Sequence, residues 1–380
     1  MIEFPLEPSV KELLPFAVFI LFGITWLIQM IYYWVVFSRL AFYRRKVTPV
    51  DLPPVSVIIC AKNEYQNLLH NLPLVLEQEY PDYEVIVVND ASDDDSIELL
   101  NSLTRKYKHL RIFDLEQNLN FFSGKKFPLS LGIKSARYEV LLLTDADCKP
   151  ASPQWIRTMV ENYGPRTEIV LGYGTYRKTV GFLNQVIRYD AFLVAMQYLS
   201  FALAGIPYMG VGRNLSYKKS LFYHTKGFIS HYKLKSGDDD LFINRVAKRK
   251  NTRIEISPDA HTISTAKASL VQWFLQKRRH YTTAKYYRPA FKFLLSLNYF
   301  SKLLLYLSFI ALMILKYNWL VSLIAFSVFF ISHWIILGMS TNKMKENDLA
   351  VMSPILEVVM LVLSPFIYIS NLIYKQERWK

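Results

Sequence analysis

The fold is decided by the stretch Val140-Leu-Leu-Leu-Thr-Asp-Ala-Asp147, in which a continuous apolar run leads into two carboxylates. Such a run is typical of a strand buried on both faces, and strands of this kind belong to parallel sheets. Ligands of open parallel sheets bind beyond the carboxyl ends of the strands. Asp145 and Asp147 therefore stand where a ligand is expected.

The residues on either side repeat a pattern of strand followed by helix. Apolar and β-branched runs predict further strands at 55–60, 83–88 and 111–113. Helical spacing of apolar residues predicts helices at 64–77, 94–107 and 128–136. This alternation predicts an α/β fold, with a mostly parallel sheet and helices on both faces.

Polar residues follow the other predicted strands as well. The first strand ends at Ala61, Asn63 and Glu64, and the second ends at Asp90. We expect these residues at the same edge of the sheet as Asp145. The acids at 93–95 fit a turn or a helix cap equally well.

Asp145 and Asp147 have the spacing of a cation site. Two carboxylates two residues apart can ligate a hard divalent cation and leave positions open for phosphate oxygens. A bound cation would offset the repulsion between these acids and a diphosphate, and would stabilise a diphosphate leaving group. Lys125 could add a positive charge for the same phosphates, although Lys125 and Lys126 also fit an ordinary solvated helix start.

Composition narrows the class of partner. The chain has 45 Lys and Arg against 31 Asp and Glu, a formal charge of +14, which predicts attraction to anionic lipids, nucleotide phosphates or nucleic acid. The cationic clusters flank apolar segments and no nucleic-acid-binding module is recognisable, so lipid is the simpler partner. Only two cysteines occur, Cys60 and Cys148, which excludes a disulfide framework and a cysteine-based zinc site and indicates a reducing compartment.

The N-terminal segment predicts a membrane anchor. Residues 13–37 carry no charge, and a helix of that length exceeds the roughly 30 Å hydrocarbon thickness of a bilayer. The acidic leading flank lacks the basic region of a signal peptide, so we expect the anchor to stay uncleaved. Arg39, Arg44, Arg45 and Lys46 follow, which predicts that this end lies in the cytoplasm.

The C-terminal region is also apolar. The runs 303–315 and 317–342 predict a hairpin of two spans. A third stretch, 349–374, contains Glu357 and two prolines and ends in cations. A fourth crossing would place those cations outside, so we predict a kinked or re-entrant hairpin there.

The ordered motifs between the membrane segments resemble those of family 2 glycosyltransferases. The resemblance extends to an acceptor-side loop, a catalytic-base motif and a Gln-x-x-Arg-Trp motif. The matching segments are Val57-Ile-Ile-Cys-Ala-Lys-Asn-Glu64, Val88-Asn-Asp-Ala-Ser-Asp-Asp94, Gly124-Lys125 with Gly132, Thr144-Asp-Ala-Asp147, Gly210-Val-Gly-Arg-Asn-Leu-Ser-Tyr217, Ser236-Gly-Asp-Asp-Asp-Leu241 and Gln276-Lys-Arg-Arg-His280.

The resemblance implies a GT-A-like fold and an inverting transfer of a sugar from a nucleotide diphosphate donor, with UDP preferred and Mg²⁺ or Mn²⁺ as cofactor. Asp147, together with Asp145, would bind the metal. The residues implied for the donor are Ala61, Asn63, Glu64, Asp90, Lys125 and Asp145, and those implied for the acceptor or diphosphate are Asn214, Gln276 and Arg279.

The resemblance also implies an acidic general base. It maps to Asp238 if Leu241 anchors the alignment, or to Asp239 if the paired acids are matched, and we favour Asp238. A hydroxyl acceptor is a poor nucleophile, so a carboxylate must take its proton as the anomeric carbon is attacked. The acids at 238–240 also fit a helix N-cap with two first-turn acids, and the two interpretations are compatible.

Three functions remain open. His280 stands where the family often has Trp, and the few predicted spans favour addition of one sugar over processive polysaccharide synthesis. A non-catalytic nucleotide-sugar-binding scaffold is the third interpretation, which the intact candidates for donor, metal and base disfavour. The stretches 267–287 and 182–206 are expected to lie along lipid headgroups.

We therefore expect a membrane anchor at 1–46, a cytoplasmic glycosyltransferase domain at 47–290 and a membrane region at 291–380. The acceptor would be a lipid-linked or membrane-proximal glycan, as in cell-envelope polysaccharide synthesis. The bacterial inner membrane is the expected location.

Overall fold

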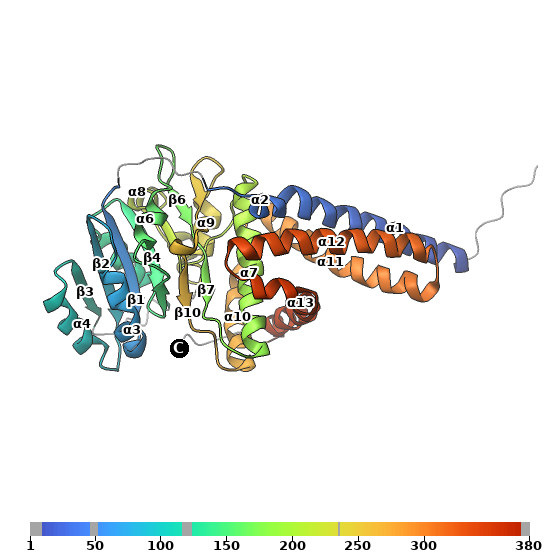
Figure 1. Ribbon diagram of the computed structural model, residues 1–380. Coiled ribbons are helices and arrows are strands. Elements are labelled where there is room, and N and C mark those ends of the chain that lie inside the picture. The colour runs from blue at the N-terminus through green and yellow to red at the C-terminus, as the bar shows by residue number, and fades with distance from the viewer. Residues whose placement is uncertain (1–9, 46–51, 116–123, 235, 374–380) are drawn as a thin grey trace, which may run out of the picture.

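The computed structural model describes residues 10–45, 52–115, 124–234 and 236–373. Figure 1 shows three parts: a sheet domain at one end, a bundle of long helices at the other, and a layer of crossing helices between them. The predicted α/β class is confirmed in the sheet domain, and the long helices lie where apolar segments were expected.

The main sheet has seven strands in the order β3-β2-β1-β4-β8-β6-β9. The first four are parallel, as the sequence predicts, because each is joined to the next along the chain by a helical crossover. The next strand, β8, runs antiparallel to β4. The bounds are β1 Val55–Ala61, β2 Tyr83–Asp90, β3 Leu110–Leu115, β4 Val140–Asp145, β6 Ile169–Leu171, β8 Leu215–Lys218 and β9 Thr252–Ile254.

A second, three-stranded sheet lies beside the carboxyl end of β4. Its order is β5-β10-β7, formed by Cys148–Pro150, Thr262–Ser264 and Gly174–Tyr176. Since β5 begins one residue after Asp147, this small sheet holds the chain that leaves the paired carboxylates.

Helices cover both faces of the main sheet. Along β1, Val57 and Ile59 point into one apolar core and Ile58 points into the other, as the two-residue period of a strand requires. The first core takes side chains from α3, α4 and α6, and the second from α5, α7, α8 and α9. The bounds are α3 Tyr65–Leu76, α4 Ser96–Lys106, α5 Lys126–Ser135, α6 Trp155–Val160, α7 Phe182–Leu203, α8 Lys219–His224 and α9 Asp240–Val246. The short 3-10 turns are η2 Ile229–His231 and η3 Pro258–Ala260.

Five helical segments are long and apolar enough to cross a membrane. Three of them, α1, α11 and α12, run side by side as the bundle at the right of Figure 1. The bounds are α1 Val10–Ile31, η1 Tyr32–Phe37 with π-helical turns, α2 Ser38–Ala41, α11 Pro289–Leu315 and α12 Trp319–Lys343. The helix α11 begins well before the apolar run predicted at 303–315, because residues 289–302 continue the helix with a mixed composition.

The other two candidates, α7 and α13, cross the direction of the bundle. In Figure 1, α7 and α10 (Leu270–Ala284) run up and down between sheet domain and bundle, and α13 (Asn347–Ile373) is viewed nearly end-on. The helix α13 packs against α7, α10 and α12. The helices α7, α10 and α13 therefore form a layer between the main sheet and the bundle.

The predicted re-entrant hairpin at 349–374 is wrong, because α13 is one helix that passes through both prolines. A proline inside a helix leaves the carbonyl four residues earlier without its N–H donor. Here other side chains replace that donor. Trp334 Nε1 donates to the Ala350 carbonyl at 3.0 Å, and Tyr299 Oη donates to the Leu361 carbonyl at 3.0 Å.

The expectation for 267–287 is only partly met. Leu270, Val271 and Leu275 of α10 are exposed, as an interfacial helix requires. Trp273, however, is buried, and the buried Lys277 pairs with Asp190 of α7 at 2.8 Å. This cation binds another helix rather than lipid headgroups.

The close approach of α5 to the sheet gives a stability prediction. A Cβ at Gly132 would lie 2.7 Å from Cγ2 of the stiff, buried side chain of Ile58. Gly132→Val should therefore lower the free energy of unfolding by about 2 kcal/mol through overpacking, measured by thermal unfolding in detergent. Gly164→Ala is the control, since its Cβ would meet its nearest neighbour at 3.8 Å, and an equal loss in both variants would contradict the explanation.

Candidate active site

Three neighbouring strands deliver the candidate residues to one edge. In the registers of β1 with its neighbours, Cys60 lies opposite Asp145, and Ala61 lies opposite Asn89. Asp90 is the next residue of β2. The sheet therefore brings the ends of β1, β2 and β4 together, as the sequence predicts.

The pKa of the Cys60 thiol depends on the charges at this edge. Burial is the main cause that raises its pKa to about 12, and the negative charges of Asp238, Asp145 and Asp90 add to the increase. Lys125 acts in the opposite direction. Acids from three distant parts of the chain thus lie close enough to act on one side chain.

Asp145, Asp147 and Cys148 form the candidate metal site. One ligand atom from each lies within 4.8 Å of the others. Burial and the charge of Asp145 raise the pKa of Asp147, which a cation between the two carboxylates would reverse. Burial also raises the pKa of the Cys148 thiol well above its usual value, so the two carboxylates are the ligands that fit a hard cation such as Mg²⁺ or Mn²⁺.

Lys125 is part of this site and is not a solvated helix residue. Its ammonium forms an ion pair with Asp145, and its side chain is largely buried. Burial alone would lower its pKa, but the negative charges of Asp145 and Asp238 raise it well above the usual value. The Lys125 ammonium therefore lies between Asp145 of the candidate metal site and the segment that carries Asp238.

Arg213 faces the same carboxylates, although the sequence analysis did not select it. Its guanidinium lies 4.5 Å from the ring centroid of Tyr176, and Nη1 donates to Ser264 Oγ at 3.1 Å. Its positive charge opposes the increase in the pKa of Asp147 and helps to lower the pKa of Asp145. The sequence signal was present, since Arg213 lies inside the matched segment 210–217.

Arg279 and Gln276 lie on α10. The pKa of Asp145 is lowered mainly by Lys125, against the effect of burial, and Arg279 also contributes. The charge of Arg279 therefore acts on the same acid as Lys125 and Arg213. Gln276 is half-buried one turn earlier on the same helix.

The acids at 238–240 differ in their bonding. Asp239 accepts the backbone N–H groups of Gly212 and Asp240, each at 2.7 Å, and caps α9. Asp240 is buried and accepts from Thr283 and from Tyr287 Oη, the latter at 2.8 Å. Asp238 is half-exposed, and no hydrogen bond to its carboxylate is found in the described part of the chain.

Protonation separates the same acids further. Burial, with the charges of Asp238 and Asp240, raises the pKa of Asp239 to about 8, so this carboxyl holds a proton at neutral pH. A protonated carboxyl that caps a helix is a poor proton acceptor. Both observations favour Asp238 over Asp239 as the available base.

Lys126 fixes the segment that leads to Asp238. Its buried ammonium donates to the carbonyls of His231, Leu234 and Ser236 at 2.9, 2.6 and 2.7 Å. Burial lowers its pKa to about 8, despite the nearby acids at 238–240. The adjacent lysines thus have different roles: Lys125 pairs with Asp145, and Lys126 holds the segment before Asp238.

The donor-side residues after β1 also have structural roles. Asn63, in the left-handed region with φ 54°, accepts the Asp93 N–H at 2.7 Å and donates its own N–H to Ser92. Glu64 is half-buried and accepts from Asn67, and Ala61 packs into the core. Asp94 accepts the N–H groups of Tyr65 and Ser96, which supports the capping interpretation for this acid.

The side chain of Asn214 has a structural role. It is fully buried, accepts from Trp155 Nε1 at 3.1 Å, and donates to the carbonyls of Tyr173 and Ala260. These bonds join the two sheets and use both N–H groups of the amide. Its neighbour Arg213 faces the acids, and a contact between Asn214 and substrate stays a prediction.

The three-carbonyl contact of Lys126 gives a testable prediction. Lys126→Met leaves buried carbonyls without a donor, which should cost about 3 kcal/mol of unfolding free energy and expose residues 229–236 to limited proteolysis. Lys134→Met on the exposed side of the same helix is the control. Equal protease resistance in the two variants would contradict the assigned role.

Comparison with known proteins agrees with this geometry. Residues 56–231 match the model of the family described as glycosyl transferase family 2. The chain is 33% identical over 132 residues to a poly-beta-1,6-N-acetyl-D-glucosamine synthase of Staphylococcus epidermidis, covering 34% of this chain and 30% of that protein. It is 29% identical over 148 residues to an uncharacterized glycosyltransferase of Haemophilus influenzae, covering 39% of this chain and 42% of that protein. The matched region thus spans less than half the length of these two relatives.

A solved structure supports the fold. The mannosyltransferase PcManGT of Pyrobaculum calidifontis, crystallised with GDP-Man and Mn2+, aligns with a TM-score of 0.57 at 18% identity, over 87% of this chain and 98% of that one. At this identity the likeness concerns the fold alone. Residues 56–231 are therefore a glycosyl transferase family 2 domain.

Proposed function

We propose that the chain is a membrane-bound inverting glycosyltransferase that moves one sugar from a nucleotide diphosphate donor to a hydroxyl of a lipid-linked or membrane-proximal glycan. The observation that carries this proposal is the convergence of Asp90, Asp145 and Asp238 around the end of β1, together with Lys125. We propose UDP as the nucleotide because of the family resemblance.

The donor would bind across the strand ends. Asp90 and Glu64 would contact the nucleoside, beside the backbone of Ala61 and Asn63. Lys125 and Arg213 would face the diphosphate, since both already lie against the metal-site acids. Their charges balance an anionic leaving group without any rearrangement of the sheet.

Asp145 and Asp147 would hold the Mg²⁺ or Mn²⁺ ion, which when bound neutralises charge on the diphosphate. Lys125 pairs with Asp145 in this structure and would contact a donor phosphate bound beside that acid. The deeply buried thiol of Cys148 stays protonated beside Asp147. The ligand set is therefore two hard oxygens, which suits these ions.

Asp238 would act as the general base. It takes the proton of the acceptor hydroxyl while that oxygen forms a bond to the anomeric carbon and the bond from this carbon to the diphosphate oxygen breaks. One displacement at one carbon inverts the configuration. Asp239 and Asp240 fix the backbone on which Asp238 is held, through Gly212 and Tyr287.

The acceptor would approach from the membrane side. Arg279 and Gln276 lie on α10, in the layer between the sheet domain and the bundle. We propose that α1, α11 and α12 span the bacterial inner membrane with the catalytic domain in the cytoplasm. The cations at 39–45 and at 343–345 lie at the bundle end nearest the sheet domain, which agrees with this orientation.

Processive polysaccharide synthesis is the second candidate. The observation in its favour is the match to relatives named as poly-beta-1,6-N-acetyl-D-glucosamine synthases. The three bundle helices and the presence of His280 at the usual Trp position favour single addition.

The base assignment predicts a specific loss. Asp238→Asn should retain donor binding, since the residue lies outside the proposed metal ligands, but transfer should fall at least about 100-fold, as expected for loss of a general base. Binding is measured by calorimetry with the nucleotide sugar, and transfer by release of the nucleoside diphosphate. The exposed Asp259→Asn is the control, and near-normal transfer by Asp238→Asn would contradict the assignment.

Product length separates the two candidates. With radiolabelled donor and membrane extract as the acceptor source, single addition predicts one labelled species whose size does not change with time. A ladder that lengthens with incubation would overturn single addition and establish the processive alternative.

A further inference from the structure

One face of α13 carries a continuous apolar stripe. Its exposed residues recur at spacings of three and four, which places them on a single side of the helix. They are Val351, Ile355, Val358, Val362, Phe366, Ile369 and Ile373, each between 47% and 75% exposed. No described residue covers this stripe, although it extends over six turns.

The opposite face is fixed by polar contacts. Glu357 is buried and accepts from Lys302 of α11 at 2.5 Å and from Tyr189 of α7 at 2.8 Å. The two carbonyls freed by the prolines accept from Trp334 of α12 and Tyr299 of α11. These contacts with three different helices set the rotation of α13, so the outward direction of its stripe is defined.

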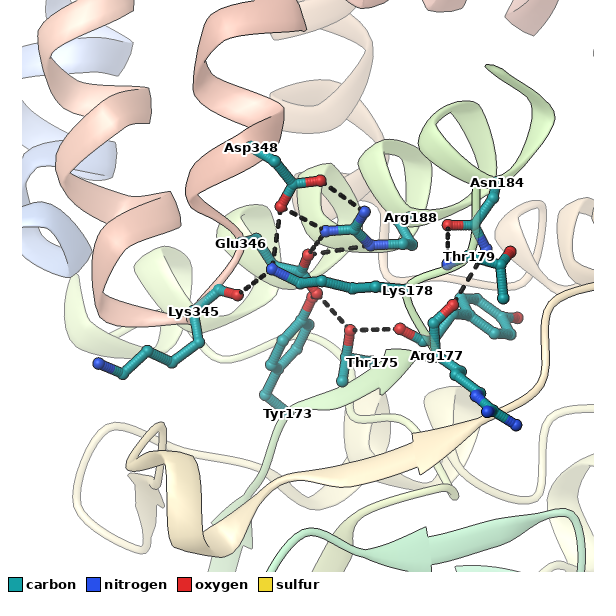
Figure 2. Close-up of polar contacts among 11 residues, drawn as sticks. Tyr173, Thr175, Arg177, Lys178, Thr179, Asn184, Arg188, Lys345, Glu346 and Asp348 are labelled. Atoms are coloured by element: carbon teal, nitrogen blue, oxygen red, sulfur yellow. Dashed lines mark hydrogen bonds and ion pairs between the residues drawn. The ribbon is translucent and has the colours of Figure 1, made fainter. Parts of the chain in front are cut away.

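A buried ion network fixes the start of the same helix, as Figure 2 shows. Arg188 of α7 is 2% exposed and binds Glu346, in the turn between α12 and α13, and Asp348, in the first turn of α13. Glu346 also accepts from Thr175 of β7. Lys178 donates to Asp348 at 2.9 Å and to the Lys345 carbonyl at 2.8 Å.

The network connects α13 to the three-stranded sheet. Thr175 belongs to β7, which pairs with β10, and Ser264 of β10 accepts from Arg213. The turn at 344–346 is therefore anchored, through Glu346, to the small sheet that supports the metal-site edge. An α13 held in this way cannot turn to follow the bundle axis without breaking the buried ion pair between Arg188 and Glu346.

We propose that α13 is an in-plane helix that lies in one leaflet at the membrane surface, with its apolar stripe in the acyl chains, and is not a fourth span. The proposal rests on the membrane placement of the bundle proposed above. The occupant of the stripe is lipid, because the stripe continues the exposed apolar surface of α12 beside it and α13 crosses the bundle direction.

This placement also accounts for the charges that follow α13. Lys375, Arg378 and Lys380 would lie on the same side as the catalytic domain, in agreement with the positive-inside bias. A fourth crossing would place all three on the other side. The topology of the chain thus becomes three spans with an amphipathic helix across their end.

Depth measurements test the proposal directly. Single cysteines at Val351, Val362 and Ile373 are labelled with a fluorophore in nanodiscs and quenched by lipids with spin labels at different acyl positions. Residues 351 and 373 are about 33 Å apart along a helix, so a spanning helix would place 362 about 16 Å deeper than both. An in-plane helix gives the same shallow depth at all three positions.

The full-length protein provides its own controls. The native thiols of Cys60 and Cys148 have raised pKa values and should label poorly at pH 7, which the unsubstituted protein checks. Cysteines at Leu320, Ile324 and Ile331, exposed on α12, should show a depth gradient. Without that gradient the proposed membrane placement fails, whereas a gradient in both helices overturns the proposal for α13 alone.

A second readout uses sidedness. A reporter fused after residue 380 should lie on the same side of the membrane as one inserted after Lys345, and opposite one inserted after Lys316. Reporters at 380 and 345 on opposite sides would establish a fourth span. The comparison is internal, so it does not depend on the absolute orientation of the protein or on its activity.

Discussion

The structure depends on the repulsion among carboxylates held at one edge of a sheet. Asp145 and Asp147 lie close enough to share a ligand, and the charges of Asp90 and Asp238 act on the same thiol. Burial makes this repulsion stronger than it would be in water. Lys125 and Arg213 balance part of it within the protein, and a metal-bound diphosphate would complete the balance. A ligand bound to these charges would therefore also change the stability of the fold.

Polar contacts join the site to the long apolar helices. Asp240 connects α9 to the end of α10 through Thr283 and Tyr287. Arg188 connects α7 to the turn before α13. A base segment supported from helices at the membrane surface would meet an acceptor presented there in one fixed orientation, which shortens the search for a productive geometry.

The central strands and their acids could be predicted because long apolar runs and strand-end carboxylates are local patterns. The structural role of Asn214 could not be predicted, since its hydrogen-bond partners Trp155, Tyr173 and Ala260 come from other parts of the chain. The continuity of α13 was missed for a similar reason. Pro354 and Pro365 predict interruption, and only the tertiary contacts of Trp334 and Tyr299 remove its cost. Sequence patterns are local, so they do not reveal hydrogen bonds between buried polar groups that lie far apart in the chain.

The most direct test of the central claim is the paramagnetic resonance spectrum of Mn²⁺ bound to the protein together with UDP whose diphosphate oxygens are enriched in ¹⁷O. Line broadening by ¹⁷O in the wild type, and its loss in a variant with both Asp145→Asn and Asp147→Asn, is the predicted result. It would show that these carboxylates hold the ion against the diphosphate. An unbroadened wild-type spectrum, or full broadening in the double variant, would contradict the account.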